Sequence, residues 1–312
     1  MKIYNAVSQL LPKNLVLANE PMSCHTSFKI GGPAEVYTMP ENAKQASDIW
    51  QLCQKEGFPL TVVGDGCNVL VSDDGIKGIV LATSRMNHIT KGITPPTSSN
   101  QTNISDNCII AGSGTKLSKL AEAACNAGLS GLEFASGIPG TVGGAVYMNA
   151  GAYGSEIKDV CTSVEALHTN GEIANHTQLG FAYRSSRFQN EDAIITSATF
   201  CLTKKNTEQI REKMTNLNAR RRESQPIGSK SAGSTFKRPA VKDKYASKLI
   251  DEHGLKGYTI GGAQVSTKHA GFVINTGNAT AKDVLALIAM IQEKIYAQTG
   301  IWLEPEVQML GF

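Results

Sequence analysis

Four segments carry apolar residues at the three- and four-residue spacing of a helix with one buried face. They span residues 41–57, 115–128, 206–224 and 280–300. Gly57 and Gly300 stand where two of these segments end, and glycine there allows the left-handed C-cap conformation. Asn206 and Thr280 stand where two segments begin, as N-caps. The pattern therefore predicts four amphipathic helices.

Short apolar runs bounded by glycine or polar residues lie between these segments and predict strands. The runs span residues 58–66, 78–83, 108–112, 162–169, 171–177, 193–202 and 301–310. Interleaved helices and strands predict an α+β fold. Residues 92–107 are polar and rich in Pro, Ser and Asn, which suits either a domain linker or a long surface loop. We favour the loop, because a predicted strand follows immediately.

Glycine gathers next to the predicted strands at residues 62–70, 109–118 and 134–154. Six of the 21 residues in the last stretch are glycine. Glycine allows positive φ and close approach of the backbone to a ligand, so that N–H groups can face phosphate oxygens. Neither the dinucleotide-binding nor the P-loop spacing is present. Composition supports two interpretations equally, a large phosphate-bearing cofactor or a close packing of strands.

The overall composition narrows the class of protein. A net charge of +3 over 312 residues argues against a nucleic-acid partner, although the basic run at 219–226 suits a small anionic ligand. Seven cysteines, with no Cys-x-x-Cys pair, predict free thiols in a reducing compartment and no metal site. Because no signal-peptide core or membrane-length apolar stretch is present, we expect a cytoplasmic protein that does not insert into membranes. We also expect a monomer.

Five motifs occur in a fixed order. They are VVGDGCNVLVSD at 62–73, GLEFASGIPGTVGGAVYMNAGAYG at 131–154, FAYRSSRF at 181–188, SAGSTFKRP at 231–239 and WLEPEV at 302–307. Together they resemble the UDP-N-acetylenolpyruvoylglucosamine reductases of bacterial cell-wall synthesis. The resemblance runs from about residue 25 to the last predicted strand, which is nearly the whole chain.

The resemblance implies a two-subdomain FAD-binding fold of the vanillyl-alcohol-oxidase type, followed by a C-terminal α+β substrate domain. We place the two FAD-binding subdomains at residues 1–90 and 91–204 and the substrate domain at 205–312. The implied reaction uses NADPH to reduce non-covalently bound FAD. Hydride then passes to the enol ether of a UDP-sugar, and protonation gives UDP-N-acetylmuramate, a peptidoglycan precursor.

Arg184 matches the arginine that stabilises the negative charge of the enolate in this family. A guanidinium is always charged and can hold a carboxylate through two hydrogen bonds. We interpret Arg187 nearby as a surface residue. Ser234 matches the proton donor of the family. On the sequence alone, Ser231 and Thr235 are equal candidates for that role.

Glu306 matches the third catalytic residue, an acidic group beside the enolate that stabilises it together with Arg184. If residues 301–310 form a strand, Glu304 points to the same face, so the family pattern and not the periodicity selects Glu306. Lys237 and Arg238 are expected to neutralise the UDP diphosphate. Tyr153 matches a tyrosine at the mouth of the substrate site.

The residues expected to bind FAD fall in two of the glycine stretches. They are Gly64, Asp65, Gly66, Cys67, Asn68, Gly137, Ile138, Pro139, Thr141, Gly143 and Ala145. Cys67 departs from the family, in which many members carry serine, and a thiol is the weaker hydrogen-bond donor. The chain resembles the shorter subgroup, which lacks a tyrosine-bearing insertion that closes over the substrate.

Two other functions fit the same fold. An oxidase of this type often tethers its flavin covalently after an Arg-Ser-Gly-Gly-His-like loop, and no such stretch occurs here. A non-catalytic flavoprotein or UDP-sugar binding module would need the glycine stretches but not Arg184, Ser234 and Glu306. Their joint presence favours the enzyme.

Overall fold

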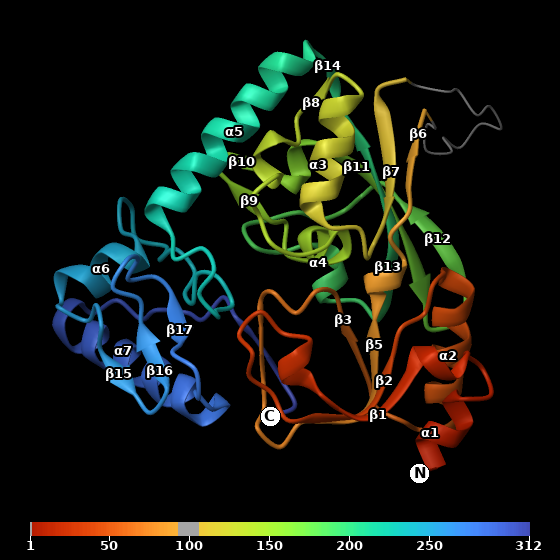
Figure 1. Cartoon of the computed structure of the whole chain (residues 1–312), viewed down its shortest axis with the longest axis horizontal. Helices are drawn as coiled ribbons and strands as arrows, with labels where there is room; N and C mark the ends of the chain where they lie inside the picture. The colour runs from red at the N-terminus through yellow and green to blue at the C-terminus, as the bar shows by residue number, and fades with distance from the viewer. Residues whose placement is uncertain (1, 93–105) are drawn as a thin grey trace. The chain divides into compact units, whose positions relative to one another are not determined.

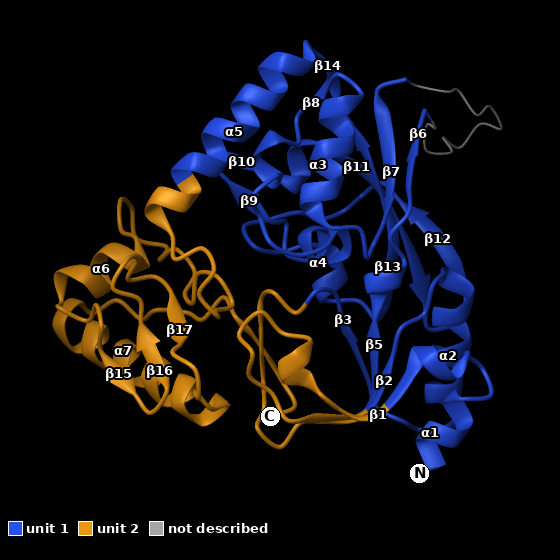
Figure 2. Cartoon of the chain, viewed as in Figure 1, with its two compact units in different colours: residues 1–17, 36–65, 78–220 blue, residues 18–35, 66–77, 221–312 orange. Residues whose placement is uncertain are grey.

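The computed structural model describes residues 2–92 and 106–312 (Figure 1). The predicted polar loop at 92–107 therefore lies almost entirely outside the described residues. The chain forms two compact units (Figure 2), of which unit 1 comprises residues 1–17, 36–65 and 78–220, and unit 2 comprises residues 18–35, 66–77 and 221–312. The division into three domains at residues 90 and 204 stays a prediction.

The four predicted helices are all present, as α2, α3, α5 and α7. The described helices are α1 (Lys2–Val7), α2 (Ala43–Glu56), α3 (Leu117–Asn126), α4 (Val142–Tyr147), α5 (Thr207–Ser224), α6 (Ala246–Glu252) and α7 (Ala281–Thr299). Gly57 and Gly300 take the left-handed C-cap conformation, with φ of +70° and +69°. Asn206 accepts hydrogen bonds from two backbone N–H groups in the first turn of α5. Within the described part of the chain, no helix has the length and apolarity needed to cross a bilayer.

The strands are short, and each of the seven predicted runs contains or overlaps one. They are β1 (Val16–Pro21), β2 (Pro33–Thr38), β3 (Leu60–Val63), β4 (Val69–Val71), β5 (Ile76–Ala82), β6 (Ile89–Lys91), β7 (Cys108–Gly112), β8 (Leu129–Ser130), β9 (Gly151–Ala152), β10 (Ser155–Glu156), β11 (Cys161–His168), β12 (Ile173–His176), β13 (Ala193–Cys201), β14 (Thr203–Lys204), β15 (Thr259–Ile260), β16 (Ala263–Val265), β17 (Val273–Asn275) and β18 (Gln308–Leu310).

Four sheets contain most of these strands. In unit 1 an antiparallel five-stranded sheet has the order β12-β11-β13-β7-β6. A four-stranded sheet has the order β1-β2-β5-β3, in which β3 runs parallel to β5. In unit 2 an antiparallel sheet of β15, β16 and β17 packs with α7, and β18 runs parallel to β4.

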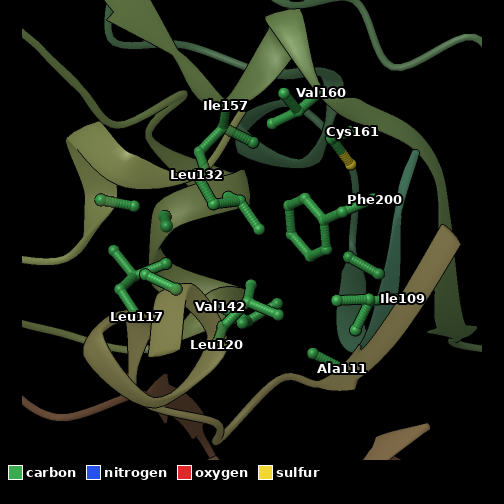
Figure 3. Close-up of a cluster of buried hydrophobic side chains, with 14 of the residues drawn as sticks. Ile109, Ala111, Leu117, Leu120, Leu132, Val142, Ile157, Val160, Cys161 and Phe200 are labelled. Atoms are coloured by element: carbon green, nitrogen blue, oxygen red, sulfur yellow. The ribbon is translucent and has the colours of Figure 1, made fainter. Parts of the chain in front are cut away.

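Unit 1 has its main core where α3 and α4 pack against the five-stranded sheet (Figure 3). Leu120 of α3, Val142 of α4 and Phe200 of β13 meet there without exposure to solvent. A second cluster in unit 1 includes Ile49 of α2. The core of unit 2 collects the buried face of α7, including Ile291. Each unit therefore buries its own apolar faces, as the helical spacing predicted.

The predicted C-terminal strand at 301–310 is wrong over most of its length, because only Gln308–Leu310 pairs as a strand. Pro305, which has no N–H to give to a ladder, forms an isolated bridge with Phe236 instead. Glu304 and Glu306 therefore do not share one face of a continuous strand.

The expectation of seven free thiols is also wrong. Cys108 of β7 and Cys201 of β13 are direct partners in the antiparallel ladder and form a disulfide, with their Cα atoms 4.2 Å apart. The two residues are 93 positions apart, so their spacing along the chain carried no information about this pairing. The other five cysteines are not disulfide-bonded. Burial raises the pKa of the Cys161 thiol to about 12 and that of Cys53 to about 11, which keeps both protonated and unreactive.

Alkylation tests the disulfide. We expect five cysteines to be labelled in denaturant without reductant and all seven after reduction. Removing the bond with Cys201→Ser should lower the free energy of unfolding by about 2–4 kcal/mol, because the unfolded chain regains the freedom of a long closed loop. Cys24→Ser, at an exposed free thiol, is the control and should leave that free energy unchanged. Labelling of all seven cysteines before reduction would contradict the disulfide.

Candidate active site

Parts of all three glycine stretches lie in unit 1, and each has a glycine there whose missing side chain allows a close contact. A Cβ atom on Gly64 would lie 2.6 Å from Oγ1 of Thr141, and one on Gly143 would lie 2.9 Å from Cβ of Ser113. A Cβ on Gly114 would overlap the backbone carbonyl of Thr83. Close packing, one of the two interpretations of the glycines, is therefore confirmed at these positions.

Backbone hydrogen bonds hold the second and third glycine stretches together. Leu117 N donates to the carbonyl of Gly140 at 3.1 Å, and Gly143 N donates to the carbonyl of Ser113 at 2.8 Å. Val142 N donates to Thr115 at 2.9 Å. Residues 113–117 and 140–143 thus form one rigid backbone surface at the start of α4.

The same surface contains polar groups that are unsatisfied among the described residues. Ser113 Oγ and Thr141 Oγ1 are buried and have no hydrogen-bond partner there. A buried hydroxyl without a partner costs about 1–3 kcal/mol, so each hydroxyl favours a bound group that can accept or donate a hydrogen bond. Lys116 adds a positive charge beside them, 3.7 Å from the carboxylate of Asp65. Buried hydroxyls, glycine backbone and a lysine are a set of donors that fits FAD, with its phosphate oxygens and polar ring edge.

The other expected FAD contacts divide between the units. Ile138 packs against the core of unit 1, and Ala145 is buried in that core. Gly66 and Asn68 belong to unit 2, where a Cβ on Gly66 would overlap the backbone carbonyl of His25. The half-buried Cys67 lies in the same loop.

A buried carboxylate precedes the longest glycine stretch. Glu133 is 2% exposed and accepts hydrogen bonds from Ser130 Oγ at 2.6 Å and Gly131 N at 3.0 Å. Burial acts to raise the pKa of Glu133, but these hydrogen bonds and Lys213 Nζ, 3.4 Å away on α5, outweigh it and hold the pKa below its usual value. Glu133 therefore stays ionised and ties the entry of the glycine stretch to α5.

Arg184 occupies a tight turn in unit 1. Ala182 and Ser185 exchange backbone hydrogen bonds of 3.0 and 3.2 Å around it. Its φ is +52°, the left-handed region that non-glycine residues rarely adopt and that often marks functional sites. The guanidinium lies over the ring of Tyr183, and Nη2 donates to the carbonyl of Gly151 at 3.4 Å. The turn thus brings Arg184 to the end of the glycine-rich stretch.

Tyr153 lies two residues beyond that contact and is also left-handed, with φ of +57°. Its hydroxyl donates to the carbonyl of Leu217 on α5 at 3.1 Å, and the guanidinium of Arg220 lies over its ring. Its exposed fraction of 40% leaves part of the ring accessible to a ligand. Arg187, which we interpreted as a surface residue, is half-buried, and its guanidinium bonds Glu191 at 2.8 Å and the carbonyl of Gln178 at 2.9 Å.

In unit 2 the segments of Ser234 and Glu306 are joined directly. Glu306 N donates to the carbonyl of Thr235 at 2.8 Å. On the other side, Asn68 Nδ2 donates to the carbonyl of Glu306 at 3.2 Å. The backbone of Glu306 is therefore held between the serine loop and a residue expected to bind FAD.

The geometry separates the three hydroxyl candidates. Thr235 is 2% exposed, and its Oγ1 accepts a hydrogen bond from Val273 N at 3.0 Å, so it is committed to the core. Ser231 is half-buried, and its carbonyl accepts from Ser27 Oγ at 2.6 Å. Ser234 alone of the three is exposed, and it follows Gly233 in a left-handed bend.

The two expected phosphate-binding residues already have partners in unit 2. Lys237 Nζ lies 2.5 Å from the carboxylate of Glu304, and its backbone N–H donates to the carbonyl of that residue at 2.8 Å. The guanidinium of Arg238 lies over the ring of Tyr245, 4.3 Å from the ring centroid. An anion could recruit Lys237 by taking the place of Glu304.

Sequence reasoning missed three residues of this site. Ser113 stands between two glycines of the second glycine stretch, a position that signals close backbone contact. Lys116 and Glu133 were not singled out, because their charged partners, Asp65 and Lys213, are distant in sequence and were brought close only by folding.

Comparisons with known proteins agree with the geometry of unit 1. The FAD binding domain family matches residues 33–177. A crystal structure of UDP-N-acetylenolpyruvylglucosamine reductase from Thermus caldophilus superposes with a TM-score of 0.76 at 33% identity, over 95% of this chain and 98% of that one. The 4-ethylphenol oxidase of Gulosibacter chungangensis shares the fold alone, with a TM-score of 0.50 at 15% identity over 65% of this chain and 42% of its own. The expected FAD-binding α+β fold is confirmed.

Neighbouring glycines of α4 offer a matched test of the FAD surface. Gly143→Ala should displace Ser113, because the new Cβ would lie 2.9 Å from Cβ of that residue. A Cβ on Gly144 meets nothing closer than Thr141 Oγ1 at 3.9 Å, so Gly144→Ala is the control. We expect Gly143→Ala to weaken FAD binding at least tenfold and lower the free energy of unfolding by about 1–3 kcal/mol. Flavin fluorescence titration and thermal unfolding measure both, and equal effects of the two variants would contradict this account.

Further comparisons concern the C-terminal part of the chain and its full length. The C-terminal domain family of UDP-N-acetylenolpyruvoylglucosamine reductase matches residues 225–310. The reductase of that name from Syntrophomonas wolfei is 44% identical over 99% of both chains. The reductase from Agathobacter rectalis is 46% identical over 98% of this chain and 97% of its own. With its FAD-binding fold and these full-length relatives, the chain belongs to the UDP-N-acetylenolpyruvoylglucosamine reductase family of FAD-dependent oxidoreductases.

Proposed function

We propose that this protein reduces UDP-N-acetylglucosamine enolpyruvate to UDP-N-acetylmuramate with electrons from NADPH, in the synthesis of peptidoglycan precursors. The observation that carries the proposal is the hydrogen bond of 2.8 Å between Glu306 N and the carbonyl of Thr235. It joins the two segments whose side chains the reaction needs beside one carbon atom, a hydroxyl proton donor and an acidic group. Family membership and the FAD-fitting surface of unit 1 support the same reaction.

At the surface formed by Ser113, Thr141 and Lys116, bound FAD would supply the hydride that NADPH provides. Addition of hydride to the enolpyruvyl group leaves a negative charge spread over the substrate carboxylate and its neighbouring carbon. Stabilising that charge as it develops is the largest catalytic demand on the protein. Arg184 meets this demand, because its guanidinium is permanently charged and its backbone is held in one turn.

Ser234 then delivers a proton to the carbanion carbon. A serine hydroxyl is a weak acid, so it acts only where the developing charge is already stabilised and a neighbouring group shares the proton. Glu306 is that neighbour in our proposal, since its backbone is held against the serine loop. The exposure of Ser234 supports its selection over the buried Thr235.

The UDP moiety is held by positive charge in unit 2. Its diphosphate would replace the carboxylate of Glu304 as the ion-pair partner of Lys237. Arg238, the next residue, would add a second positive charge. Tyr153 offers a partly exposed ring to the sugar. Each of these contacts acts on the bound substrate, so we expect their loss to raise KM more than it lowers kcat.

An anaerobic absorbance titration separates the half-reactions of the proposed function. We expect a flavin band that is bleached by NADPH and recovers when the UDP-enolpyruvyl sugar is added. Release of the flavin by mild acid would show that it is not covalently bound. Bleaching without recovery would discard the substrate but keep the flavoenzyme, and a colourless protein that takes up no FAD would overturn the proposal.

Single substitutions test the residue roles. Arg184→Ala should slow substrate reduction about 10²–10³-fold by removing charge stabilisation. Ser234→Ala should slow it about 10²-fold or more by removing the proton donor. Both variants should bind FAD and be reduced by NADPH normally. Ser231→Ala is the matched control for the serine, and near-complete loss of activity in that variant, with activity retained in Ser234→Ala, would reverse the assignment.

A further inference from the structure

The turn that carries Arg184 needs outside support. Its φ of +52° lies in the left-handed region, where glycine is more stable than a residue with a side chain such as arginine. The two hydrogen bonds between Ala182 and Ser185 close the turn but do not hold it against the rest of unit 1. A left-handed arginine persists only where its surroundings determine the backbone more strongly than its own preference does.

Gln189 contacts the backbone of Arg184 directly. It ends the short 3₁₀ helix Arg187–Gln189. Its side-chain amide nitrogen donates to the carbonyl of Arg184 at 3.0 Å and to the carbonyl of Tyr147 at 2.8 Å. An amide carries two hydrogens, so both can be used at once. Because Tyr147 is the last residue of α4, Gln189 ties the carbonyl of Arg184 to the end of that helix.

Asn149 holds the beginning of the same turn. It is fully buried, and its Nδ2 donates to the carbonyl of Ala182 at 2.9 Å and to the carboxylate of Glu156 at 2.5 Å. Its Oδ1 accepts from Lys158 N at 3.0 Å. The side chain is thereby satisfied on both ends, and a satisfied buried amide is rigid. Asn149 lies two residues beyond the last residue of α4. Both supports therefore connect the turn to the C-terminal end of α4.

We propose that Gln189 and Asn149 are positioning residues that set the direction in which Arg184 presents its guanidinium to the reacting substrate. This inference rests on the role proposed for Arg184 in stabilising the enolate. Gln189 restrains the carbonyl on one side of the left-handed residue, and Asn149 restrains the carbonyl two residues before it. With both carbonyls fixed, the Cα–Cβ bond of Arg184 has one direction. Loss of Gln189 lets φ relax toward negative values and swings the guanidinium away from Gly151.

Two other side chains of the same segment, those of Arg187 and Ser186, hydrogen-bond elsewhere. Arg187, in the same 3₁₀ helix, uses its guanidinium on Glu191 and the carbonyl of Gln178. Ser186 Oγ donates to the carbonyl of Tyr147 at 2.9 Å, which fixes the far side of the turn but not Arg184 itself. Gln189, in contrast, donates directly to the backbone carbonyl of Arg184.

The test substitutes Gln189→Leu, which removes both donors at similar volume, in the full-length FAD-loaded enzyme. Stopped-flow absorbance then measures flavin reduction by NADPH and flavin reoxidation by the UDP-enolpyruvyl sugar separately. We expect reoxidation to slow about 10- to 100-fold, because misplacing a catalytic group by about 1 Å has effects of this size. Flavin reduction, FAD content and thermal midpoint should stay near those of the parent, since Gln189 is only half-buried. Asn190→Ala, at the exposed next residue, is the control.

A double substitution distinguishes positioning from an independent effect. In an Arg184→Ala background, Gln189→Leu should slow reoxidation no further, because Gln189 acts through the missing guanidinium. Additive slowing in the double variant, or equal slowing of both half-reactions in Gln189→Leu, would overturn the inference. If Arg184→Ala slows flavin reoxidation but Gln189→Leu does not, the positioning role is wrong while the proposed function stands. If Arg184→Ala keeps full activity, the role proposed for Arg184 is itself wrong. Asn149→Ser, whose burial puts folding at risk, is a secondary variant and should act in the same direction as Gln189→Leu.

Discussion

The contact between the backbones of Gly143 and Ser113 determines how α4 and the FAD-fitting surface are arranged in unit 1. A hydrogen bond of 2.8 Å joins Gly143 N to the carbonyl of Ser113, at an approach so close that a single Cβ on the glycine would meet Ser113. This contact fixes the start of α4 against the loop between β7 and α3. It also buries the hydroxyls of Ser113 and Thr141 where a cofactor can use them. Glycine is needed here because both requirements, packing and access to a ligand, exclude a side chain at the same point.

The C-terminal end of α4 passes this constraint to the chemistry. The carbonyl of Tyr147 accepts hydrogen bonds from Gln189 and Ser186, and Asn149 reaches the carbonyl of Ala182. These hydrogen bonds attach the turn of Arg184 to the C-terminal end of α4. The N-terminal end of the same helix forms part of the FAD-fitting surface. A rigid element between cofactor and catalytic residue is what electrostatic preorganisation requires, since a guanidinium that must first reorient loses much of its advantage. The strain of a left-handed arginine is retained because the supporting bonds outweigh it.

Unit 2 positions its candidate catalytic residues in a different way. Its catalytic candidates lie on irregular segments, and pairing between those segments positions them. Thr235 is the anchor, because its carbonyl accepts from Glu306 while its hydroxyl accepts from Val273 in the core. The neighbouring Ser234 is left exposed as a result. Of these two adjacent residues, Thr235 has the structural role and Ser234 is the candidate for catalysis. The order of hydroxyl residues along the chain does not reveal this difference.

Local patterns in the sequence determined the four long helices and their caps, most strands of the five-stranded sheet, and the family to which the chain belongs. These features depend on spacing along the chain, and the motifs of the family are themselves contiguous. Tertiary structure alone decided the disulfide of Cys108 and Cys201, the loss of the predicted strand around Pro305, and the pairing of Lys237 with Glu304. It also decided which hydroxyl is exposed and how Arg184 is held. Each of these depends on which distant segments become neighbours, and burial, charge pairing and backbone strain take their values only after those neighbours have met.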